Sequence, residues 1–98
     1  MKLYHATAVE NVEDINEYGL RPALSEKVSH DERLNKEAVY GFNNIKDAVD
    51  FITDNGHPSY AVYSFECENP TVDTEYESNS YALVTEDYVK ATLEFIEA

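Results

Sequence analysis

The chain has few of the residues that several kinds of function require. Its single cysteine, Cys67, excludes an intramolecular disulfide and is typical of a protein from a reducing cytosol. The three glycines are isolated, so the sequence contains no glycine-rich phosphate loop. No apolar run approaches the length of a membrane span, and no N-terminal stretch resembles a signal peptide. We therefore expect a cytoplasmic protein that makes no contact with a membrane.

Positive charge is also scarce. The chain has seven Lys and Arg against twenty Asp and Glu, a formal net charge of −13. Residues 50–98 hold eleven of these carboxylates and one cation, whereas residues 1–49 hold nine carboxylates and six cations. Such a chain repels nucleic acid and anionic lipid and attracts basic surfaces. We expect a basic protein as partner and no direct binding of nucleic acid; solubility alone is the plainer interpretation of the charge.

Neither a metal site nor a thiol nucleophile is indicated. The three histidines have no ligand-like spacing to one another or to Cys67. Glu66 and Glu68 flank the cysteine, and their charge opposes formation of a thiolate. We therefore expect no bound metal and no cysteine–histidine catalytic pair.

The pattern of apolar residues over 1–98 predicts a single α+β domain, with a small mixed or antiparallel sheet and two or three helices. Residues 1–6 are typical of an opening strand. Thr7 and Glu10 have the spacing of a capping box, which predicts that a helix begins there. Gly19 then predicts the end of this helix.

The middle of the chain contains a second strand and a second helix. Residues 24–37 fit either a short additional helix or a loop. The segment 38–42 predicts a strand, Asn44 is the expected cap of the following helix, and Gly56 is its expected stop. The helix has one apolar stripe, formed by Ile45, Ala48, Val49 and Ile52.

The C-terminal part predicts strands. Residues 60–68 and 72–78 alternate between apolar and polar side chains, and 81–84 is a short apolar strand. One face of the first of these strands is expected to contain Ala61, Tyr63, Phe65 and Cys67. Residues 89–95 fit a strand better than a helix capped by Thr85, because the alternation has more matches.

Several short motifs resemble those of the ADP-ribosyltransferase fold. The segment 3–7 (Leu-Tyr-His-Ala-Thr), a helix, and then 18–22 (Tyr-Gly-Leu-Arg-Pro) are similar to the opening of small members of that group. The strand 39–42 (Val-Tyr-Gly-Phe) and the helix 46–51, which contains Asp-Ala, look like its second motif. The segment 81–90 is similar to its closing strand and turn. The resemblance spans most of the chain and implies an ADP-ribosyltransferase-like fold.

This resemblance also implies a site for NAD. His5 matches the histidine that hydrogen-bonds a ribose hydroxyl, and Thr7 lies beside it. Tyr40 matches the tyrosine that stacks on nicotinamide, and Arg21 is one of the few cations that could balance the phosphates. The family places a catalytic carboxylate at the start of a late strand, where placed charges stabilise the transition state. Here residues 78–81 read Ser-Asn-Ser-Tyr, so the implied carboxylate would be Glu77, slightly upstream.

Each of these residues also has a structural interpretation. His5 fits a hydrogen-bonded core histidine, Thr7 a helix cap, and Tyr40 an aromatic residue of a sheet. Glu75 and Glu77 fit a solvated strand edge.

A row of carboxylates offers a second kind of site. Alternate residues on a strand are about 6.6 Å apart, on the scale of the phosphate spacing along one nucleic-acid strand. Such a row could occupy a groove built for DNA or RNA, or could simply protect a strand edge from aggregation. The expected acidic face consists of Glu66, Glu68, Asp73, Glu75 and Glu77.

Two functions follow. In the first, the chain is an acidic inhibitor in the cytosol of a host cell, similar to phage proteins of the anti-CRISPR or anti-restriction type. It would have an ADP-ribosyltransferase-like fold without a clear catalytic glutamate, would need no cofactor, and would block a basic nucleic-acid-binding surface of its partner. In the alternative, it is an active NAD-dependent ADP-ribosyltransferase that modifies a host or defence protein through His5, Tyr40 and Glu77.

Overall fold

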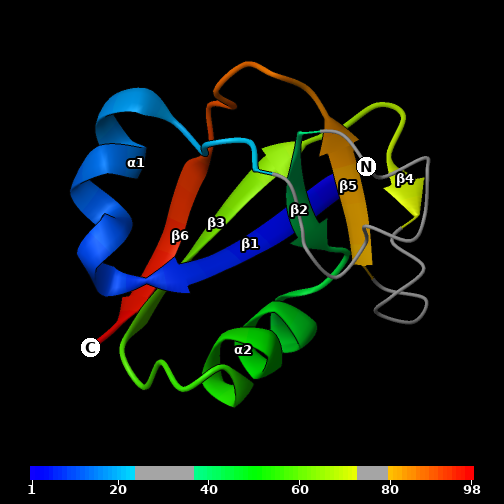
Figure 1. Ribbon diagram of the computed structural model, residues 1–98. Coiled ribbons are helices and arrows are strands. Elements are labelled where there is room, and N and C mark those ends of the chain that lie inside the picture. The colour runs from blue at the N-terminus through cyan, green and yellow to red at the C-terminus, as the bar shows by residue number, and fades with distance from the viewer. Residues whose placement is uncertain (24–36, 73–79) are drawn as a thin grey trace.

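Two helices pack against a six-stranded antiparallel sheet in the computed structural model of the protein (Figure 1), which describes residues 1–23, 37–72 and 80–98. The strands are β1 (Lys2–Ala8), β2 (Ala38–Phe42), β3 (Tyr60–Glu66), β4 (Thr71–Val72), β5 (Ser80–Val84) and β6 (Thr92–Glu97). The helices are α1 (Val12–Tyr18), which follows the 3-10 turn η1 (Val9–Asn11), and α2 (Ile45–Asp54). The predicted α+β class is confirmed, and every strand pair in the described ranges is antiparallel.

The first strand lies inside the sheet, whose order is β4-β5-β2-β1-β3-β6. β1 pairs with β3 along its full length, from Lys2 opposite Glu66 to Ala8 opposite Tyr60. On its other side it pairs with β2. The neighbours of β1 therefore come from distant parts of the sequence, and they fix which way its side chains point.

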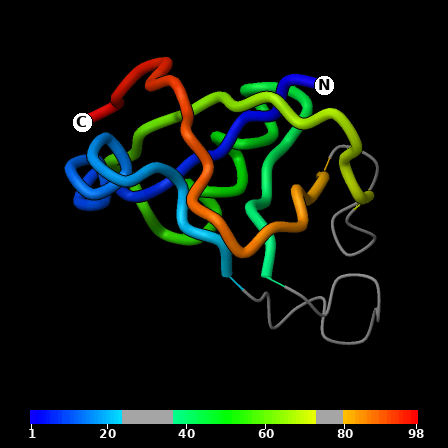
Figure 2. Tube along the Cα trace, turned by 90° about the horizontal axis from the view of Figure 1, so that it is seen from above, coloured from blue at the N-terminus to red at the C-terminus, as the bar shows by residue number. Residues whose placement is uncertain are grey.

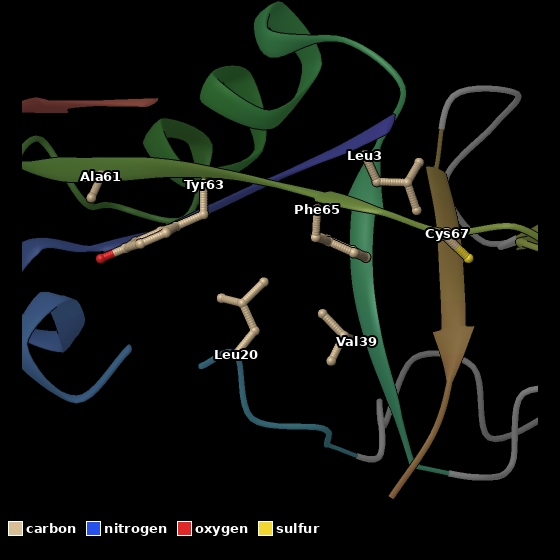
Figure 3. Close-up of a cluster of buried hydrophobic side chains, with 7 residues drawn as sticks. All are labelled: Leu3, Leu20, Val39, Ala61, Tyr63, Phe65 and Cys67. Atoms are coloured by element: carbon tan, nitrogen blue, oxygen red, sulfur yellow. The ribbon is translucent and has the colours of Figure 1, made fainter. Parts of the chain in front are cut away.

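Both faces of the sheet are covered. On one side, called here the α1 face, side chains of β1, β2 and β3 pack with Leu20, which follows α1 (Figure 3). On the other side, the α2 face, Ala48 and Ile52 pack against Ala6 and Val62. The cluster on the α1 face consists of Leu3, Leu20, Val39, Ala61, Tyr63, Phe65 and Cys67. Burial of each large apolar side chain stabilises the fold by about 1.5–3 kcal/mol.

The alternation predicted for β3 is confirmed on one face. Its odd-numbered residues all belong to the cluster on the α1 face. The opposite face is also buried, because α2 covers Val62, and Ser64 is only 4% exposed. Glu68 lies beyond the end of β3, which is shorter than predicted.

The predicted capping box is wrong, because β1 continues through Thr7 to Ala8, and Glu10 lies in η1. Thr7 pairs with Ala61 of β3, and Asn11 is the N-cap of α1, without a side-chain cap hydrogen bond. The hydroxyl oxygen of Thr7 accepts a hydrogen bond of 2.9 Å from Nδ2 of Asn11. Pairing with a distant strand has thus overridden the local preference of threonine for a helix start.

Gly19 ends α1, as predicted. Its φ of +100° and ψ of −177° belong to a region that residues with a side chain rarely adopt. A Cβ atom at this position would lie 2.7 Å from the carbonyl oxygen of Val89. Directly after it, Leu20 and Val89 exchange backbone hydrogen bonds of 2.7 and 3.0 Å. The exit of α1 therefore runs beside the segment that leads to β6, as the cyan and orange parts of the tube show in Figure 2.

α2 begins at its predicted cap. Oδ1 of Asn44 accepts a hydrogen bond of 2.9 Å from the backbone amide of Asp47. Ala48 and Ile52 are buried under the sheet, whereas Ile45 at the start of the stripe is 38% exposed. Amphipathic spacing together with a capping side chain thus explains why this segment is a helix.

The C-terminal segment is a strand, as predicted, although β6 begins only at Thr92. The preceding predicted strand over 72–78 is described only at its start, where β4 ends at Val72. Residues 73–79, like the alternative helix or loop over 24–36, lie outside the described residues. Neither of the helices in the described ranges is long and apolar enough to cross a membrane.

Candidate functional site

A pocket of ≈ 440 Å³ lies between β1, α1 and the segments that follow α1 and β5. Three of the four residues that the resemblance implies for NAD line it together: His5, Thr7 and Arg21. The other lining residues are Asn11, Asp14, Ile15, Tyr18, Gly19, Leu20 and Tyr88. Those from η1 and α1 follow the i, i+3, i+4, i+7 spacing of one helical face, from Asn11 to Tyr18.

His5 contributes a neutral imidazole to this pocket. Its Nδ1 lies 2.8 Å from the backbone carbonyl oxygen of Tyr40. Because a carbonyl oxygen can only accept, Nδ1 carries a hydrogen and the neutral ring keeps Nε2 as an acceptor. Burial lowers the pKa of His5, and the hydrogen bond to Tyr40 opposes this shift in part. The ring is therefore an uncharged hydrogen-bonding group near neutral pH.

Tyr40 does not line the pocket, because its side chain lies on the α2 face. Tyr4 pairs with Phe42, and both pack toward α2. Tyr40 lies two residues before Phe42 on the same strand and so shares its face, where it packs against buried alanines of β2 and β5. His5 follows Tyr4 and faces the other way. The structure thus joins His5 to the Tyr40 backbone and does not bring the two rings together.

The two charged side chains of the pocket are not paired with each other. Asp14 and Arg21 both line it, both are exposed, and neither forms an ion pair with a described residue. Thr7, by contrast, is 8% exposed, and its hydroxyl is engaged by Asn11. The part of the lining that the structure describes therefore offers a ligand one anion, one cation and a neutral acceptor.

Two tyrosines that the sequence analysis missed stand at this pocket. The ring centroids of Tyr18 and Tyr88 are 6.2 Å apart, with an interplanar angle of 43°. These residues are 59% and 55% exposed. The spacing of residues 11, 14 and 18 along α1 is a signal that could have revealed the helical part of the lining. No local signal marks Tyr88, because it reaches the pocket only through the Leu20–Val89 pairing.

Of the predicted acidic face, two members are described, and both are exposed. The Glu66 side chain is 76% exposed and lies 3.8 Å from the N-terminal amine, and Glu68 follows the end of β3. The other members, Asp73, Glu75 and the implied catalytic Glu77, lie outside the described residues. Within residues 1–23, 37–72 and 80–98, no group of three or more His, Cys, Asp or Glu is placed to hold a metal ion.

A second pocket of ≈ 450 Å³ lies beside β3 and the start of β6. Two of its described charged side chains, Lys2 and Glu94, pair with each other. Nζ of Lys2 is 3.9 Å from Oε2 of Glu94, and this oxygen also accepts a hydrogen bond from the buried Ser64 hydroxyl. The pocket on the α1 face, where Asp14 and Arg21 have no such partners, is therefore the stronger candidate for a ligand.

Comparison of the chain with protein-family models, with curated proteins and with solved structures gives no match.

Proposed function

We propose that the chain is a small acidic interaction protein that blocks a basic, nucleic-acid-binding surface of another protein. Its fold would be ADP-ribosyltransferase-like, without a clear catalytic glutamate. The partner would be of the kind that defends a host cell, such as a CRISPR or restriction complex. The observation that carries this proposal is the distribution of charge around α1.

Six exposed carboxylates surround the end of the molecule that holds the pocket. Four lie on η1 and α1, and two lie in the segment just before Tyr88, whose ring contacts Tyr18. We call this the α1 surface; its carboxylates are Glu10, Glu13, Asp14, Glu17, Glu86 and Asp87. An acidic surface interrupted by tyrosines complements the Lys and Arg side chains with which proteins hold nucleic acid.

Few cations oppose this surface. The described ranges contain fourteen Asp and Glu but four Lys and Arg. Two of these cations are occupied, since Lys46 pairs with Asp50 at 2.9 Å and Lys2 lies near Glu94. A basic partner would therefore meet an almost uncompensated negative field, which accelerates association and weakens with salt.

Retention of partners on the immobilised chain tests this function. Proteins captured from host lysate are identified, purified and assayed for binding to a labelled duplex or guide RNA with and without the chain. We expect at least one captured protein to be basic, to lose its nucleic acid to the chain, and to be released as ionic strength rises. The proposal is wrong if no captured protein loses nucleic-acid binding.

Two variants with equal changes in charge locate the interface. Changing Glu10, Glu13, Glu17 and Glu86 to Gln removes four charges from the α1 surface. Changing Glu37, Glu66, Glu68 and Glu97 to Gln removes four charges elsewhere, including the described part of the strand face predicted from sequence. We expect the first variant to lose inhibition and the second to retain most of it; the reverse result would move the interface to the strand face.

An NAD-dependent ADP-ribosyltransferase is the second candidate. It is favoured by the convergence of His5, Thr7 and Arg21 in one pocket, whereas the position of the Tyr40 ring on the α2 face weighs against stacking on nicotinamide. Labelled NAD is incubated with the chain and host lysate, with His5→Ala, Glu77→Gln and Glu75→Gln as variants. Label transfer that is lost in His5→Ala and Glu77→Gln supports the enzyme, and absence of transfer by the unmodified chain excludes it under those conditions.

A further inference from the structure

The pocket on the α1 face is lined by charged, polar and aromatic side chains, and this combination favours some classes of ligand over others. Asp14 supplies a carboxylate without an ion pair, and the exposed rings of Tyr18 and Tyr88 stand beside it. His5 adds a neutral acceptor. A carboxylate next to aromatic faces is the combination that holds a guanidinium, which stacks on rings and donates hydrogen bonds in its own plane.

We infer that this pocket binds an arginine side chain that the basic partner inserts between Asp14 and the two tyrosines. This inference rests on the proposed function, because the arginine belongs to the partner that the α1 surface attracts. Around the pocket, exposed Glu17 and the carboxylates before Tyr88 add negative field that draws a cation toward the mouth.

The volume and the remaining polar groups fit this occupant. A pocket of ≈ 440 Å³ holds one long side chain and part of its backbone, and is smaller than many sites for whole cofactors. Among the described lining residues, Arg21 is the one group of the same charge as the occupant. Its N–H groups can donate to a backbone carbonyl of the inserted residue, while its charge lowers affinity for the guanidinium.

Arginine is favoured over lysine by the geometry of the rings. The planar guanidinium stacks on an aromatic face and keeps its donors in the plane, whereas an ammonium is more strongly hydrated and acts as a point charge. The Tyr18 and Tyr88 rings are tilted by 43° and half-exposed, so a flat group can lie against one of them without displacing it.

The test is a titration of the ¹⁵N-labelled chain with the N-acetylated, C-amidated tripeptide Gly-Arg-Gly, and with its lysine counterpart, at constant ionic strength. We expect amide shifts confined to residues of the pocket and a dissociation constant on the order of 1 mM, with the lysine peptide weaker by about threefold or more. Absence of pocket shifts, or equal binding of both peptides, would overturn the inference.

Variants with matched charge separate the pocket from the general field. Asp14→Asn is expected to weaken the arginine peptide about tenfold, whereas Glu13→Gln, on the same helix but outside the pocket, should change it less than twofold. Tyr88→Leu should remove the preference for arginine over lysine. Arg21→Gln keeps an N–H donor and loses the like charge, so it should tighten binding; weaker binding would indicate a site for an anion instead. Equal effects of Asp14→Asn and Glu13→Gln would contradict the inference.

Binding of the full partner distinguishes the two proposals. If partner capture depends on the α1 surface but the peptide does not enter the pocket, the arginine site is wrong and the proposed function stands. If no basic partner competes with nucleic acid but the arginine peptide binds as described, the proposed function is wrong and the pocket remains an arginine site.

Discussion

Nδ1 of His5 donates a hydrogen bond of 2.8 Å to the backbone carbonyl oxygen of Tyr40, and this bond links β1 to β2. The contact fixes the tautomer of the imidazole, because the carbonyl accepts and Nε2 is left without a proton in the neutral ring. Protonation of the ring would add charge to a group whose burial already disfavours the charged form. The same contact therefore connects the chemistry of the pocket to the stability of the sheet.

Stability is expected to fall in mild acid because of His5. Its folded-state pKa lies below the ordinary value of 6.5, so the unfolded chain binds more protons as the pH falls. The contribution of His5 to the free energy of unfolding is complete above pH 6.5 and is lost as the pH falls toward the folded-state pKa. The slope of this loss is at most about 1.4 kcal/mol per pH unit. Urea unfolding at several pH values between about 7.5 and 5.5 measures it. His5→Gln should flatten this dependence; an unchanged slope in this variant would refute the assignment.

Gly19→Ala is expected to destabilise the chain by roughly 3 kcal/mol or more, since it adds a clash to an unfavourable φ. Its Cβ would meet the Val89 carbonyl oxygen at 2.7 Å. Gly56→Ala is the matched control, because Gly56 also has a positive φ, of +86°, but nothing lies within 4 Å of an added Cβ. That change should cost only about 1–2 kcal/mol. Chemical denaturation of both variants gives the comparison, and equal losses would mean that the close approach to Val89 contributes nothing.

Tyr63→Phe should loosen α1 without opening a cavity. The Tyr63 hydroxyl, beneath the helix, donates to Oδ1 of Asn16 at 2.8 Å. Asn16 is exposed, so water replaces the lost donor and the expected cost is about 0.5–1.5 kcal/mol. Hydrogen exchange of α1 amides should rise in this variant. Tyr60→Phe on the same strand keeps its ring contact with Phe95 and should leave exchange in α1 unchanged; equal effects of both changes would argue against the Asn16 contact.

Asn44→Ala is expected to cost about 1 kcal/mol, because it removes the side chain that caps α2. The capping bond that is lost runs from the Asp47 amide to Oδ1 of Asn44, at 2.9 Å. The change also removes two bonds that Nδ2 of Asn44 donates, to Oδ2 of Asp47 and to Oδ1 of Asn43. Asn43→Ala serves as control, since Asn43 only accepts from the Asn44 side chain and leaves the cap in place. Thermal unfolding followed by circular dichroism measures both variants. A larger loss for Asn43→Ala would show that the cap is not the stabilising feature.

The elements that local chemistry determines could be predicted from the sequence. β2 has its predicted bounds, and α2 begins after the asparagine expected to cap it. Thr7 shows where local reasoning fails. Its spacing to Glu10 is that of a capping box, but seven consecutive pairings between β1 and β3 extend the strand past it. A local sequence pattern does not reveal contacts between distant segments, and here these contacts outweigh the capping preference of Thr7.

The candidate site could be predicted only in part, for the same reason. Alternation along each strand is visible in the sequence, but the register between strands is not. A shift of one residue in the pairing of Tyr4 with Phe42 would move the Tyr40 ring to the face of His5. The contact of Tyr18 with Tyr88 likewise depends on a pairing across most of the chain.

The backbone pairing of Leu20 with Val89 has a consequence for the order of folding. Its two hydrogen bonds join residues that are 69 positions apart in the sequence, so they close a long loop. Tyr88 reaches its place beside Tyr18 only when this loop has closed, whereas the other described lining residues lie within residues 5–21. We therefore expect the aromatic pair of the pocket to form late in folding, after the local contacts of α1.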